Sequence, residues 1–147
     1  MRKYPDRPWV GIGIVVHKGD YILLIKRGKE PNRGLWSLPG GAQTLGETVK
    51  QAAFREVLEE TNVHTINHQL IDVVDSIHKD KSDKFTYHYT LIEMSCEYDN
   101  GNVIAQDDAA DAQWVHISDL NNFGLQDETL RIIDMSYRSR KASLTDE

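Results

Sequence analysis

The chain has 147 residues and a mass of 16.8 kDa, which is the size of one domain with a substantial core. Lysine and arginine number 17 against 23 aspartates and glutamates, and this net charge of −6 excludes nucleic-acid binding through bulk positive charge. The 39% hydrophobic content and mean hydropathy of −0.52 exclude a membrane protein and argue against wholesale disorder. The single cysteine, Cys96, excludes an internal disulfide.

The first eight residues are basic, but the segment after them lacks a secretory signal. Trp9 and a glycine-interrupted stretch follow, without the apolar core and cleavage site of an exported protein. No apolar run approaches the roughly 20 residues of a membrane helix. We therefore expect a cytoplasmic protein with no membrane partner.

The first half of the chain predicts a hairpin and then a helix. Residues 9–16 and 21–25 are apolar and rich in strand-forming residues, and turn-forming residues separate them. A polar loop over 26–34 follows, and residues 39–41 (Pro-Gly-Gly) predict a tight turn. Neither glycine nor proline interrupts residues 47–61, which predict the clearest helix of the chain.

The second half predicts mainly strands and a closing helix. In chain order we expect strands over 70–74 and 85–92, an Asn-Gly hairpin turn over 99–102, a strand over 114–116, a helical turn over 118–120 and an amphipathic helix over 126–138. From about residue 139 we expect a frayed tail. This order predicts one α/β or α+β domain over residues 1–147, with helices around a mostly mixed sheet.

The helix over 47–61 has an acidic face. Glu56 and Glu60 lie four residues apart and therefore stack on one side of the helix, with Glu59 beside them. Like charges at this spacing destabilise a helix, and a bound divalent cation such as Mg²⁺ would offset that cost. A solvated acidic surface is the alternative interpretation.

The residues around this helix carry a longer pattern. Residues 41–63 match G-x5-E-x7-R-E-U-x-E-E-x-G-U, where U is aliphatic, at eight of nine fixed positions. This segment resembles the Nudix box of the Nudix hydrolase family. Asn62 stands where the final glycine is expected, and asparagine is the next most tolerant residue of the left-handed conformation that ends a helix. We expect Asn62 to reduce stability by up to about 1 kcal/mol and to leave activity unaffected.

The resemblance covers roughly residues 9–120 and implies a fold and a metal site. The family fold is an α/β/α sandwich with a mixed sheet, in agreement with the element order above. By matching position, Glu56, Glu59 and Glu60 would bind Mg²⁺ or Mn²⁺, together with a backbone carbonyl of Gly40 or Gly41.

The resemblance also implies roles for residues around these glutamates. Glu47 and Arg55 would be structural partners that orient the acidic cluster. The general base would be Glu59 on the helix or, alternatively, Asp108 or Asp111 in the acidic stretch near residue 110. A solvated hairpin end is the other interpretation of these aspartates.

A basic cluster precedes the box and suggests phosphate binding. Lys26, Arg27, Lys29 and Arg33 lie within eight residues, and Arg27 and Arg33 are the candidates to hold substrate phosphate. A plain solvated loop is the alternative.

The implied reaction is hydrolysis of the diphosphate in a nucleoside diphosphate linked to a group X. The segments GLWSLPGG and DDAADAQWV look most like small ADP-ribose pyrophosphatase-type members, so ADP-ribose or a related nucleotide sugar is the first candidate. The absence of proline after Pro39 counts against it, because many ADP-ribose hydrolases carry one beyond the box. The alternatives are a pyrophosphatase that removes modified nucleoside triphosphates and a catalytically silent nucleotide-binding module. A homodimer is possible, since many relatives form one.

Overall fold

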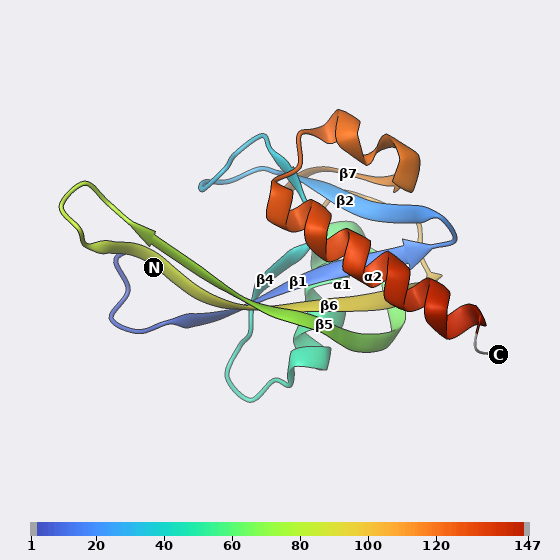
Figure 1. Ribbon diagram of the computed structural model, residues 1–147, viewed down its shortest axis with the longest axis horizontal. Helices are drawn as coiled ribbons and strands as arrows, with labels where there is room; N and C mark the ends of the chain where they lie inside the picture. Colours follow the sequence, from blue (N-terminus) through green and yellow to red (C-terminus); the bar gives the residue numbers. More distant parts are fainter. Residues whose placement is uncertain (1–2, 146–147) are drawn as a thin grey trace.

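The computed structural model describes residues 3–145 as a sheet between two helices (Figure 1). The strands are β1 (Trp9–Lys18), β2 (Tyr21–Arg27), β3 (Trp36–Ser37), β4 (Gly40–Ala42), β5 (His64–Lys79), β6 (Phe85–Asn100) and β7 (Ala109–His116). The helices are α1 (Val49–Thr61), the 3-10 helix η1 (Ile117–Phe123) and α2 (Asp127–Thr145). The predicted α/β/α sandwich is confirmed.

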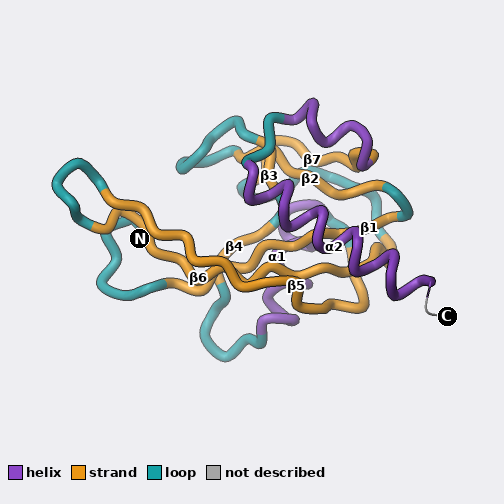
Figure 2. Tube along the Cα trace, viewed as in Figure 1, coloured by secondary structure: helices purple, strands orange, loops and turns teal. Residues whose placement is uncertain are grey.

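The sheet is mixed and β1 lies at its centre. Its order is β3-β2-β1-β6-β5, with β4 also paired to β1 and β7 to β2. The pairing of β1 with β6 is parallel, and the other pairings are antiparallel. Figure 2 shows the long loop between β2 and β3 leaving the end of the sheet at which β7 also begins.

Alternation along β1 separates two cores. Ile12 and Ile14 pack toward α1, whereas Val15 packs with residues of α2 on the opposite face. Gly11 and Gly13 lie on that second face, and side chains of β6 occupy the space that their own side chains would fill. Figure 1 shows α2 crossing this face and α1 behind the sheet.

Local interactions define both ends of α1. The Thr48 side chain accepts a hydrogen bond from the Gln51 backbone, and the Gln51 side chain accepts one from the Thr48 backbone. At the other end Asn62 adopts φ +65°, and its N–H donates to the Leu58 carbonyl. The predicted left-handed cap at Asn62 is confirmed.

Several predicted boundaries in the second half are wrong. The hairpin over 99–102 is absent, because β7 pairs with β2 and residues after Asn100 form a connection across the sheet. The frayed tail from residue 139 is also wrong, since α2 continues to Thr145. Arg140 of this last part donates to Glu97 of β6 at 2.7 Å, a tertiary ion pair that helical periodicity does not reveal.

Strands β5 and β6 are far longer than predicted. They pair along most of their lengths and project from the domain as a twisted hairpin (Figure 1). The Tyr4 hydroxyl donates to Asp80 near its tip at 2.9 Å. Among residues 3–145, no helix is long and apolar enough to cross a membrane.

Candidate active site

Two of the three predicted metal-binding glutamates are buried on α1. Glu56 is 9% exposed and Glu60 is 4% exposed, while Glu59 faces solvent. Oε1 of Glu60 accepts a hydrogen bond from the Gly40 amide at 2.8 Å. The acidic face of α1 therefore packs against β4, where the box begins.

Arg55 connects these carboxylates to the segment that precedes the helix. Its Nε and Nη2 donate to the two carboxylate oxygens of Glu47, at 2.6 and 2.9 Å. Its Nη1 donates to Glu56 at 2.8 Å and to Glu59 at 3.2 Å. A fifth bond, 3.0 Å long, reaches the Ala42 carbonyl from Nη2. Arg55 therefore connects the helix, the loop and β4.

The same bonds stabilise the charged form of Glu47. Hydrogen bonding from Arg55 is the largest cause that lowers the pKa of Glu47 to about 2, and bonds from Thr44 lower it further. Glu47 is consequently ionised throughout the neutral range and keeps Arg55 oriented.

Two glycines allow the backbone of β4 to approach the acidic face closely. A Cβ on Gly41 would lie 2.4 Å from Oε1 of Glu56. A Cβ on Gly40 would lie 2.2 Å from the Ile12 carbonyl oxygen across the β1–β4 pair. Any side chain at either position would displace Glu56 or separate the strands.

Without a bound cation, burial disfavours the ionised forms of Glu56 and Glu60. Burial is the largest cause that raises the pKa of Glu60 to about 8; repulsion from Glu56 adds to it, and the Gly40 amide opposes it. Burial likewise raises the pKa of Glu56, against the attraction of Arg55. A divalent cation would favour the ionised forms of both groups.

The donor set fits a hard cation in its chemistry. Glu56, Glu59 and Glu60 offer carboxylate oxygens from one face of one helix. Within the described residues, however, no three acidic, histidine or cysteine side chains already converge as a ready-made metal site. Oxygens that now contact Arg55 or solvent would have to turn toward a common point.

The two aspartates proposed as general base, Asp108 and Asp111, lie in different surroundings. Asp108 lies close enough to raise the pKa of Glu60 by repulsion, and its Oδ1 pairs with Nζ of Lys29 at 2.7 Å. Asp111 is exposed on β7 and caps the Ala112 amide. Only Asp108 lines the cleft beside the acidic face.

The two arginines proposed for phosphate binding, Arg27 and Arg33, also differ in their position relative to the cleft. Arg27 lines the cleft at the end of β2, and its positive charge lowers the pKa of Glu60. Its Nε donates to the Pro31 carbonyl at 2.7 Å. Arg33 lies exposed in the loop and is not among the residues that line the cleft.

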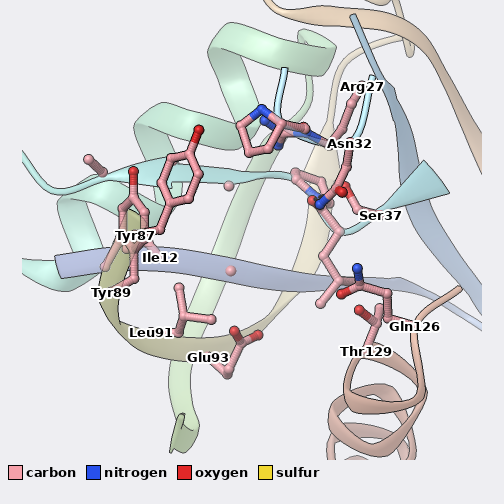
Figure 3. Close-up of a pocket in the computed structure, with 18 of the residues that line it drawn as sticks. Ile12, Arg27, Asn32, Ser37, Tyr87, Tyr89, Leu91, Glu93, Gln126 and Thr129 are labelled. Atoms are coloured by element: carbon pink, nitrogen blue, oxygen red, sulfur yellow. Dashed lines mark hydrogen bonds between the residues drawn. The ribbon is translucent and has the colours of Figure 1, made fainter. Parts of the chain in front are cut away.

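A cleft of about 770 Å³ adjoins the acidic face on the α2 side of the sheet. One end is lined by Gly40, Gly41, Arg27 and Asp108, which lie next to the glutamates. Figure 3 shows its other end, where a row of side chains on β6 faces residues at the start of α2: Tyr87, Tyr89, Leu91, Glu93, Gln126 and Thr129. Its volume is typical of a small-molecule site.

Glu93 and the two glycines of β1, Gly11 and Gly13, were not predicted from the sequence as site residues. The signal was present, because Glu93 continues the alternation of Tyr87, Tyr89 and Leu91 one position beyond the predicted strand. An acidic residue on a face that is otherwise apolar indicates a functional position.

Comparison with known proteins identifies the family. The NUDIX domain model matches residues 7–135. The ADP-ribose pyrophosphatase of Methanocaldococcus jannaschii is 32% identical over 123 residues, which cover 84% of this chain and 70% of that protein.

Two solved structures have the same fold. The MutT NUDIX hydrolase of Burkholderia pseudomallei is similar with a TM-score of 0.75 and 28% identity, covering 88% of this chain and 98% of that one. A bifunctional NMN adenylyltransferase/ADP ribose pyrophosphatase of Francisella tularensis, complexed with AMP and a manganese ion, has a TM-score of 0.68 and 25% identity. That match covers 90% of this chain and 42% of the Francisella chain.

The family match covers the box helix, its flanking glycines and the cleft beside them. The chain therefore belongs to the Nudix family and is a Nudix pyrophosphohydrolase.

Proposed function

We propose that Glu56, Glu59 and Glu60, with a backbone carbonyl of Gly40 or Gly41, bind Mg²⁺ or Mn²⁺ for hydrolysis of a nucleotide diphosphate bond. The observation that carries this proposal is the burial of two carboxylates against Gly40 and Gly41 at the end of the cleft. A bound divalent cation would neutralise phosphate oxygens and lower the pKa of a bound water.

The surrounding residues supply positioning and proton transfer. Arg55 and Glu47 orient the carboxylates, and Arg27 holds a substrate phosphate at the rim of the cleft. We assign the general base to Glu59, whose side chain is 45% exposed and can accept a proton from water. Asp108 is the alternative, although its carboxylate is paired with Lys29.

The roles of these two acids can be separated by matched substitutions. Glu59→Gln and Asp108→Asn would be compared through kcat across pH. We expect Glu59→Gln to lower kcat at every pH, and Asp108→Asn to retain the native kcat. A full kcat at every pH in Glu59→Gln, with loss in Asp108→Asn, would transfer the role to Asp108.

ADP-ribose is the first substrate candidate. It rests on the ADP-ribose pyrophosphatase of M. jannaschii, which aligns with most of this chain, and on the GLWSLPGG and DDAADAQWV segments. A second candidate is a purine nucleoside triphosphate of the guanine type. Buried Glu93 in the cleft favours it, because an ionised carboxylate accepts two hydrogen bonds and donates none.

A substrate panel tests both the activity and the candidates. ADP-ribose, dinucleotides, nucleotide sugars and nucleoside triphosphates would be incubated with Mg²⁺ or Mn²⁺, and the products identified. AMP plus ribose 5-phosphate supports the first candidate, whereas a monophosphate plus pyrophosphate supports the second. No turnover of any member by the folded protein would overturn the proposal and indicate a silent binding module.

A further inference from the structure

Glu93 is a buried carboxylate in the cleft, and the described residues offer it no hydrogen-bond donor. It is 8% exposed, and within the described part of the chain no group donates a hydrogen bond to it. A buried carboxylate without donors is expensive, and most such groups in proteins have partners. The missing donors can come from a ligand that enters the cleft.

The neighbouring strand β1 has glycines where side chains would collide with Glu93 and Leu91. Gly13 is paired with Glu93 across the parallel β1–β6 ladder, and a Cβ there would lie 2.6 Å from Oε2. Gly11 is likewise paired with Leu91, whose Cδ2 would lie 2.7 Å from an added Cβ. The two glycines therefore make room for the side chains of Glu93 and Leu91, which lie over them and face the cleft (Figure 3).

Arg131, whose positive charge acts on Glu93, forms its ion pairs with other acids. Arg131 of α2 pairs with both Glu128 and Asp72. Burial is the largest cause that raises the pKa of Glu93 to about 7, with repulsion from Glu128 next. N–H donors from a ligand would favour the ionised carboxylate and offset its burial.

We propose that Glu93 recognises the Watson–Crick edge of a guanine-type base by accepting hydrogen bonds from its N1–H and 2-amino groups. Guanine is the ordinary base with two adjacent N–H donors on one edge, which match the two oxygens of a carboxylate. Adenine offers one amino group beside an acceptor, and would leave one oxygen of Glu93 facing a lone pair. Leu91, two residues before Glu93 on the same face of β6, offers an apolar side chain for the base to pack against, whereas Tyr87 and Tyr89 lie further along the strand.

The position of Glu93 relative to the acidic face suits a nucleotide. Gly13 lies between Glu93 on β6 and Gly40 on β4, so two strand spacings, about 10 Å, separate the backbones of Glu93 and Gly40. A base held by the Glu93 carboxylate therefore lies within the length of one nucleoside from the diphosphate site beside Gly40. The inference rests on the proposed function for the location of the phosphates, and it favours the guanine-type substrate over ADP-ribose.

Binding without turnover tests this inference independently of catalysis. Calorimetric affinities would be measured for guanosine, inosine and adenosine 5′-monophosphates without added metal. Inosine lacks only the 2-amino group, so we expect about tenfold weaker binding than guanosine, and about 100-fold weaker binding for adenosine.

The variant Glu93→Gln should change which base the protein prefers, and not merely weaken binding. A glutamine amide presents one acceptor and one donor, which match the amino group and N1 of adenine. We expect the ratio of guanosine to adenosine affinity to fall at least 100-fold. Glu97→Gln is the matched control, because Glu97 lies on the same strand and face but pairs with Arg140 outside the cleft. Its base preference should equal that of the native protein.

Equal affinities for the three monophosphates in the native protein would overturn the inference, even if Glu93→Gln failed to fold. An unchanged preference in folded Glu93→Gln would overturn it as well. Neither result affects the proposed hydrolysis, which is judged by product formation in the substrate panel. Conversely, a guanosine preference in binding with no turnover of any substrate would overturn the proposed hydrolysis and retain the base site.

Discussion

Arg55 shows how one side chain organises the acidic face. Its guanidinium contacts Glu47, Glu56 and Glu59 and also the carbonyl of Ala42. The planar group satisfies several acceptors in fixed directions, which a flexible ammonium group cannot do. Such an arrangement positions carboxylates that would otherwise repel one another.

Substitution of Arg55 by lysine should therefore impair activity more than folding. We expect Arg55→Lys to reduce kcat about 10- to 100-fold, because the carboxylates lose their orientation. The lost hydrogen bonds should lower the free energy of unfolding by about 1–3 kcal/mol. Steady-state kinetics and urea unfolding of the same preparation measure both effects, and an unchanged kcat would contradict the positioning role.

Glu60→Gln should impair catalysis without lowering the free energy of unfolding, in contrast to Arg55→Lys. Gln can still accept the hydrogen bond from the Gly40 amide, and it resembles the protonated Glu60 that a pKa of about 8 favours at neutral pH in the metal-free protein. We expect the free energy of unfolding to stay equal or rise, while kcat/KM falls at least about 100-fold. Activity assays with Mg²⁺ and thermal unfolding provide the two measurements. Unchanged turnover would refute the assignment of Glu60 as a metal ligand.

At the scale of elements, the ends of α1 and the glycines of the sheet define the site. The capping box at Thr48 and the left-handed Asn62 determine where the helix begins and ends, and hence which turn faces β4. Gly13 and Gly41 let side chains of other elements occupy space next to the backbone: Glu93 in one case and Glu56 in the other. The elements thus place Glu93 in the cleft and Glu56 against Gly41 at the end of the cleft.

The cap at Asn62 predicts a simple stability series. Asn62→Ala should lower the free energy of unfolding by about 1–2 kcal/mol, because alanine resists φ +65° and loses the bond from Nδ2 to the Asn102 carbonyl. Asn62→Gly should stay within about 0.5 kcal/mol of the native protein, since easier backbone geometry offsets the lost bond. Urea unfolding measures both values. An alanine variant as stable as the glycine variant would show that the cap conformation contributes nothing.

At the scale of the whole molecule, α2 closes one face of the sheet through apolar packing and a buried polar pair. Leu125, Ile132 and Ile133 pack on this face, and Nε2 of His17 lies 2.6 Å from Oγ of Ser136. His17 is 1% exposed, and burial is the main cause that lowers its pKa to about 4, with Arg140 adding to the effect. The neutral imidazole therefore belongs to the folded state.

His17 should make the free energy of unfolding depend on pH. The unfolded chain binds the proton near pH 6.5 and the folded chain only near pH 4, so the contribution of His17 is complete above 6.5 and is lost as pH falls toward 4. The loss should amount to about 3 kcal/mol at pH 4. Unfolding free energies from pH 7 to pH 4 should fall less steeply in His17→Leu than in the native protein. Parallel profiles for the two proteins would contradict this role.

The local features of the site could be predicted from the sequence because they depend on residues near one another in the chain. The acidic face, the partners Arg55 and Glu47, and the cap at Asn62 all lie within 41–63, where helical geometry determines their relative positions. The match to the Nudix box added the expected metal site and fold. The choice between Asp108 and Asp111, and between Arg27 and Arg33, depended on which loop residues reach the cleft.

What only the tertiary structure decided was the pairing between distant strands. Alternation shows that a strand has two faces, but it does not show which strand lies beside it. The parallel pairing of β1 with β6 brings Glu93 to Gly13, and the pairing of β7 with β2 replaces the hairpin expected over 99–102. The sequence by itself therefore determined the chemistry of the acidic helix, whereas long-range pairing placed a second carboxylate in the cleft beside it.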